Sequence, residues 1–161
     1  MMTRTKGIQL SLFVLLMAGA GRHEVRAQPE TARQSAEPAH VAVISADYAF
    51  VELPPTIAAG PTLFSFQNRG AKRHEMSITL LTMGVAVDSL LAAGERATVG
   101  SRAVSDSIVG LLIARPRERS GGQLYANLIA GRTYIVICTL RDTPDARRHA
   151  DLGMVGYFLV R

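Results

Sequence analysis

The last quarter of the chain carries a cysteine, a histidine and a methionine around one loop between two apolar segments. Cys138 ends the β-branched run 134–138, His149 follows after ten intervening residues, and Met154 directly precedes the apolar run 155–160. Where two neighbouring strands end side by side, the residues at their ends and in the loop between them can meet. A thiolate and imidazoles, with a weakly bound thioether, form the soft ligand set that suits copper. This segment therefore favours a fold in which two strands end at a metal site.

A copper site of this kind needs a second imidazole, and the chain has one plausible donor far upstream. His74 begins an alternating segment, whereas His40 lies in a polar stretch and is interpreted as solvated. Taken singly, each candidate has an ordinary alternative, such as a rim position for His74 and a core position for Cys138 or Met154. The metal interpretation depends on their occurring together, because no histidine besides His74 and His149 lies in the predicted folded part.

The first 27 residues have the pattern of a secretory signal peptide. Arg4 and Lys6 precede the apolar run 8–20, and the segment closes with Val25-Arg26-Ala27, where a signal peptidase reads small or short residues. An uncleaved anchor is the alternative, but the apolar run is short beside the roughly 20 residues of a membrane-spanning helix. We expect cleavage after residue 27, a periplasmic or secreted protein, and no stable membrane insertion afterwards.

Removal of the signal peptide changes the charge and sharpens the question about the cysteine. Cleavage removes four basic residues and one acidic residue, which lowers the formal charge from +5 to +2. No basic block interleaves with aromatic residues, so nucleic-acid binding has no support. A single cysteine in an exported chain makes no internal disulfide, so Cys138 stays free, pairs between molecules or binds something. Because free thiols oxidise outside the cytosol, a metal-binding role is the more attractive.

The mature chain has the length of one domain and consists mostly of short predicted strands. Residues 28–40 are polar and lack any period, and they are predicted to form a disordered leader ahead of a domain at 41–161. Short alternating segments separated by turn residues predict an antiparallel β-sandwich, that is, a mainly β fold. The predicted strands are 41–51, 62–67, 74–81, 123–129, 133–140 and 154–160.

Three local patterns make this prediction more specific. Phe64 and Phe66 lie on one face of an alternating segment, which predicts that the aromatic face is buried. Ser and Asp residues ahead of an apolar run predict a short helical insertion at 105–115. Ala130 and Gly131 separate two predicted strands as a hairpin-like break.

Three motifs together resemble the cupredoxins, the plastocyanin- and azurin-like blue copper proteins and their secreted bacterial relatives. The motifs are N-x-G…HE at 68–75, G-x-x-Y-x-x-x-C at 131–138, and H-x-x-x-G-M at 149–154, ahead of a terminal strand. The resemblance implies a Greek-key β-sandwich that binds one copper ion, cycling between Cu⁺ and Cu²⁺, at one end. Matched residue by residue, it implies four copper ligands: His74, Cys138, His149 and Met154.

Neighbouring residues suggest how such a site is tuned and where it departs from the small carriers. We expect the Thr139 N–H to donate to the cysteine sulfur, and the Asn68 amide to tie the two ligand loops together. Glu75 stands where the small carriers usually have Asn, and either adds negative charge near the metal or points away along its strand. The loop 139–148 is longer than in those carriers. We expect it to be mobile without metal, with His149 packing against little.

The sequence leaves three classes of function open. The leading interpretation is a type 1 copper protein that passes single electrons between partner redox proteins, with no substrate of its own. The second is a copper carrier or buffer that binds Cu⁺ through its sulfurs. The third is a metal-free cupredoxin-like module that binds a protein. An enzyme is not expected, because the serines are not set in a nucleophile elbow and the aspartates are scattered.

Overall fold

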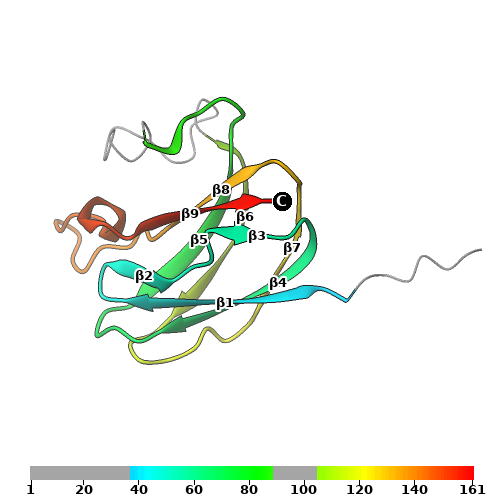
Figure 1. The fold of residues 1–161 in the computed structure, drawn as a ribbon. Coiled ribbons are helices and arrows are strands. Elements are labelled where there is room, and N and C mark those ends of the chain that lie inside the picture. Colours follow the sequence, from blue (N-terminus) through cyan, green and yellow to red (C-terminus); the bar gives the residue numbers. More distant parts are fainter. Residues whose placement is uncertain (1–36, 89–104) are drawn as a thin grey trace, which may run out of the picture. The chain divides into compact units, whose positions relative to one another are not determined.

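The structure, a computed structural model, describes residues 37–88 and 105–161, which form two sheets packed face to face (Figure 1). The predicted signal peptide and residues 28–36 of the predicted leader lie outside these ranges. The first strand begins at Ala39, so the last two residues of the predicted leader belong to it, and His40 is exposed there. Within the described ranges no helix is long and apolar enough to cross a bilayer.

The described residues form nine strands in two sheets, and the predicted β-sandwich is confirmed. Two pairs, β1 with β4 and β3 with β9, run parallel, so both sheets are mixed rather than wholly antiparallel. The first sheet has the order β2-β1-β4-β7 and the second the order β3-β9-β8-β5-β6. The strands are β1 (Ala39–Ala46), β2 (Ala49–Glu52), β3 (Thr56–Ile57), β4 (Gly60–Asn68), β5 (His74–Leu81), β6 (Ser105–Ala114), β7 (Leu124–Leu128), β8 (Thr133–Ile137) and β9 (Val155–Val160).

The core lies between the sheets and follows the predicted alternation. Phe64 and Phe66 point inward from β4 and are almost fully buried, which confirms the buried aromatic face. Phe64 meets Phe158 of the other sheet at a centroid distance of 5.9 Å, and Phe158 stacks on Tyr134 at 5.2 Å. Such aromatic pairs each contribute about 0.5–1.5 kcal/mol beyond burial, and the Phe64–Phe158 pair joins the two sheets.

Two predictions about local structure were wrong. The segment predicted as a short helix is β6, which pairs along β5 and shows the period of a strand, with Leu111 and Ile113 exposed and Ala114 buried. Pairing with a long buried strand outweighed the weak helix-cap signal. Gly131 does not close a hairpin, because β7 pairs with β4 while β8 pairs with β5 and β9. The break at 130–131 instead carries the chain from one sheet to the other.

The strand register brings the motifs of the sequence to one end of the sandwich. Ile137 of β8 pairs with Val155 of β9 and with Ser77 of β5. Cys138 and Met154, each one residue beyond such a pair, therefore lie opposite each other at the strand ends, and His74 begins β5 at the same end. In Figure 1 the loop that joins β8 to β9, coloured orange to red, projects from this end.

Candidate metal centre

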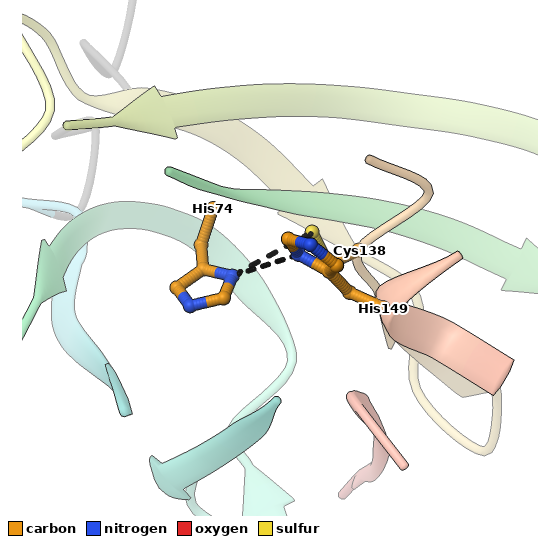
Figure 2. Close-up of side chains that lie close together, drawn as sticks. All are labelled: His74, Cys138 and His149. Carbon is orange, nitrogen blue, oxygen red and sulfur yellow. Dashed lines mark hydrogen bonds between the residues drawn. The ribbon is translucent and has the colours of Figure 1, made fainter. Parts of the chain in front are cut away.

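Three donor atoms from distant parts of the chain converge on one buried place (Figure 2). The Nδ1 atoms of His74 and His149 are 3.1 Å apart, and the Cys138 sulfur lies 3.4 Å from Nδ1 of His149 and 4.0 Å from Nδ1 of His74. His74 and Cys138 are 0% exposed and His149 is 1% exposed. The structure thus brings together three of the four ligands that the resemblance implied, each with a donor atom facing the others.

Met154, the fourth implied ligand, is fixed beside these residues by the backbone. Its carbonyl accepts a hydrogen bond from the Cys138 N–H at 3.2 Å, and its N–H donates to the His149 carbonyl at 2.9 Å. The side chain is fully buried. The left-handed conformation of Gly153, with φ of 109°, ends the 3-10 helix η2 (His149–Leu152) and lets the chain turn into β9.

The loop between Cys138 and His149 is closed at its base by two backbone hydrogen bonds. The His149 N–H donates to the Leu140 carbonyl, and the Ala150 N–H donates to the Cys138 carbonyl, both at 2.8 Å. These bonds return His149 to the cysteine although ten residues intervene. The expectation that His149 packs against little is wrong, because its ring is buried and meets the Tyr48 ring edge-on at 5.0 Å.

The surroundings of the cysteine differ from those expected. The Glu75 N–H, not the Thr139 N–H, donates to the sulfur, at 3.4 Å. The Thr139 N–H and hydroxyl both donate to the Glu75 carboxylate, at 2.8 and 2.6 Å. Of the two orientations considered for Glu75, the one toward the site is correct. Burial raises the pKa of the Cys138 thiol, and the N–H groups of Glu75 and Leu140 oppose that rise.

Asn68 fixes the loop that leads to His74, not the loop that carries Cys138. Its amide nitrogen donates to the carbonyls of Lys72, Ala114 and Arg115, and its amide oxygen accepts from the Gly70 N–H. The side chain is fully buried, and its bonds with the Ala114 carbonyl and the Gly70 N–H are buried too, so these two pair backbone groups inside the protein. The expected tie between the two ligand loops is therefore wrong for this residue.

The outward nitrogen of each imidazole faces a carboxylate, which the sequence did not reveal. Nε2 of His74 lies 3.4 Å from Asp47, and Nε2 of His149 lies 3.3 Å from Asp142. The Tyr48 hydroxyl donates to Asp142 at 2.6 Å. The sequence held one sign of this arrangement. The imperfect alternation in 41–51 is caused by a turn at Asp47 and Tyr48 between β1 and β2. Burial lowers the pKa of His74, and Asp47 partly offsets this shift.

The donor set fits one metal ion. With metal–nitrogen and metal–sulfur bonds of about 2.0 and 2.3 Å, as known for zinc, neighbouring ligand atoms lie about 3.3–3.8 Å apart. The three donor atoms are 3.1, 3.4 and 4.0 Å apart, which is within or close to this range. Where a carboxylate accepts a hydrogen bond from Nε2, that nitrogen carries the proton and Nδ1 presents a lone pair. Two such lone pairs and a sulfur in one buried place are what a soft cation would bind.

Comparison with known proteins places the fold. No protein-family profile and no curated protein sequence matches the chain. Among solved structures, the reduced auracyanin of the photosynthetic bacterium Roseiflexus castenholzii superposes with a TM-score of 0.51 and 19% identity, over 76% of this chain and 96% of the neighbour. Auracyanin B gives 0.50 and 18%, over 78% and 91%. Auracyanin A of Chloroflexus aurantiacus, a "blue" copper protein, gives 0.48 and 18%, over 78% and 100%.

These identities are low, so the likeness concerns the fold. The auracyanins are cupredoxins, and the chain shares their architecture over most of its length. The cupredoxin-like β-sandwich that the sequence motifs indicated is therefore confirmed.

Proposed function

We propose that this protein is a type 1 copper protein that carries single electrons between partner redox proteins, without a substrate of its own. The proposal rests above all on the buried convergence of the Cys138 sulfur with Nδ1 of His74 and His149. Met154, tied by its backbone to both Cys138 and His149, is proposed as a fourth ligand that would bind the metal weakly.

In this function the protein holds the donor atoms in a fixed arrangement while the site gains and loses one electron. Bound copper would supply one-electron chemistry by alternating between Cu⁺, which prefers sulfur, and Cu²⁺, which prefers imidazole. A set of one thiolate and two imidazoles serves both states, so a rigid arrangement needs little change between them. Burial of all three residues keeps water and other ligands away from the site. The Glu75 N–H directed at the sulfur withdraws charge from the thiolate and thereby tunes the potential.

The visible spectrum after addition of Cu²⁺ to the purified mature protein tests this proposal. We expect an intense blue or green charge-transfer band from the Cys138 thiolate. Cys138→Ser should abolish it, because an alcohol neither ionises readily nor donates comparable charge to Cu²⁺. Met154→Leu should keep the colour and raise the reduction potential, because a weak donor to Cu²⁺ is lost.

Other outcomes of the same titration point to the other two functions. Tight Cu⁺ binding without a stable coloured Cu²⁺ form would indicate a copper carrier or buffer. A colourless protein that binds neither Cu²⁺ nor Cu⁺ would contradict the proposal and favour a metal-free protein-binding module.

The proposal includes a location outside the cytosol, either periplasmic or secreted. It is supported by the signal-peptide pattern of residues 1–27 and by the single cysteine, Cys138. Intact-mass measurement of the exported protein should give an N-terminus at or within a few residues of Gln28. A mass that retains residues 1–27 would overturn this part of the proposal.

A further inference from the structure

The turn between β1 and β2 touches both imidazoles of the site, and it does so with two adjacent residues. Asp47 faces Nε2 of His74 at 3.4 Å. Tyr48 donates its hydroxyl to Asp142, whose other oxygen faces Nε2 of His149 at 3.3 Å. A single turn thus reaches Nε2 of both rings, directly at His74 and through Asp142 at His149.

The conformation of this turn is unusual for the residues that occupy it. Tyr48 has a φ of 59°, in the left-handed region that an aromatic residue seldom adopts. Such a conformation is unfavourable for a residue with a Cβ and persists where surrounding contacts determine it. Here those contacts are the hydrogen bond to Asp142 and edge-on ring contacts with His149 and His74, at centroid distances of 5.0 and 6.2 Å.

Further contacts hold both carboxylates in place. The N–H groups of Ala71 and Lys72 donate to the Asp47 oxygen at 2.8 and 3.1 Å, and the Lys72 ammonium lies 3.4 Å from Asp142. Any side chain at position 70 would meet that Asp47 oxygen, since a Cβ on Gly70 would lie 2.3 Å from it. The glycine therefore permits the close approach on which the contact with His74 depends.

We propose that Asp47, Tyr48 and Asp142 form one positioning cluster, which holds Nε2 of both imidazoles against a carboxylate and directs Nδ1 of both toward Cys138. In this arrangement Asp142, the carboxylate held by Tyr48, anchors the long loop over His149 and prepares the ring to bind metal before the metal arrives. The inference rests on the proposed copper site, because the Nδ1 atoms would bind the copper. The positioning of the two rings, however, exists without metal.

The experiment measures the His149 tautomer in the copper-free, ¹⁵N-labelled protein and then the affinity of each variant for Cu²⁺. In the wild-type protein we expect the Nε2–H tautomer. Asp142→Ala should populate the Nδ1–H tautomer and lower the affinity for Cu²⁺ about 10- to 100-fold, the range found for loss of a partner behind a ligand. Tyr48→Phe, which keeps the ring and removes only the hydroxyl, should shift both quantities in the same direction by less.

Matched variants separate positioning from a general structural role. Asp145→Ala removes an exposed carboxylate of the same loop, and Tyr125→Phe removes the hydroxyl of an exposed tyrosine on β7; both should behave like wild type. Asp142→Glu retains the carboxylate and should recover part of the tautomer and part of the affinity. An unchanged His149 tautomer in Asp142→Ala would overturn the inference, as would an unchanged affinity. If the wild-type protein binds no copper, the proposed function fails, while the tautomer measurement still decides the inference.

Discussion

His74 and His149 present the same nitrogen to the same sulfur, but two different kinds of segment hold them. His74 begins a strand whose eight residues are all buried, and the loop before it is fixed by the fully buried Asn68. His149 stands at the end of a long polar loop whose side-chain contacts, to Tyr48 and Lys72, lie nearer the surface. His74 is therefore positioned by the core, whereas His149 is positioned by contacts nearer the surface.

This difference separates stability from tuning. Changes around His74 disturb backbone groups that only the protein can pair, so they should affect folding as well as metal binding. Changes around Asp142 disturb groups that water can partly replace, so they should act mainly on the orientation and basicity of one imidazole. Four experiments, ordered from the largest expected effect to the smallest, can break or sharpen this contrast.

Asn68→Ala should give the largest loss of stability. It leaves two buried backbone groups, the Ala114 carbonyl and the Gly70 N–H, without their partner, at about 1–3 kcal/mol each, so we expect the free energy of unfolding to fall by about 3 kcal/mol. Urea unfolding of the metal-free protein measures this. Gln67→Ala, at the neighbouring half-buried position of β4, should lose under about 1 kcal/mol. Equal losses for the two variants would show that Asn68 does not have this role.

His149→Ala should lose most of the stabilisation that copper confers. At a copper concentration one hundredfold above its dissociation constant, binding stabilises the wild-type protein by about 2.7 kcal/mol. Thermal melts with and without copper should show this shift in wild type and in His40→Ala, whose histidine is exposed on β1, but not in His149→Ala or His74→Ala. Because His149 is buried, its alanine variant should also melt earlier without copper. An equal copper-induced shift in wild type and His149→Ala would mean that His149 is not a ligand.

Gly70→Ala, in the loop before His74, should cause a smaller loss of stability. The added Cβ meets the Asp47 carboxylate and its backbone nitrogen, so the turn and the loop before His74 must separate, at a cost of about 1–3 kcal/mol. Gly121→Ala, where a Cβ meets nothing within 4 Å, is the matched control and should change stability little. Chemical denaturation of both variants decides the matter, and a neutral Gly70→Ala would show that the close approach is not required.

The smallest effect should be the pH dependence of the stability that Asp142, in the loop before His149, contributes. The hydrogen bond from Tyr48 lowers the pKa of Asp142, with Lys72 and His149 acting in the same direction. The folded state therefore favours the ionised carboxylate of Asp142. The contribution of this carboxylate to the free energy of unfolding is complete above the ordinary pKa of 3.8, and it is lost as the pH falls through the lowered pKa. The stability difference between wild type and Asp142→Asn, without metal, should be constant near neutral pH and shrink in acid. A difference that grows in acid would contradict this assignment.

The sequence predicted the sandwich from short-range patterns, and the resemblance of its motifs implied four ligands, of which His74, Cys138 and His149 meet in the structure. Alternation in 62–67 and 74–81 identified core strands, and the motifs around Cys138 and His149 lie close together in the chain. The positioning contacts were not predictable in this way, since Tyr48 and Asp142 are 94 residues apart and meet only through the strand register. The strand β6 was missed for a related reason, because its pairing with β5 is not visible in its own residues.

The two backbone hydrogen bonds at the base of the 139–148 loop have a consequence for how such a protein can diversify. They fix the exit from Cys138 and the return to His149 whatever lies between, so the excursion can lengthen or shorten without changing the separation of sulfur and nitrogen. Residues between the two bonds are then free to vary with the partner or the potential that selection favours, and Asp142 is one outcome of that freedom. Spacing between the cysteine and the histidine is accordingly a poor criterion for rejecting a chain as a relative of the small carriers.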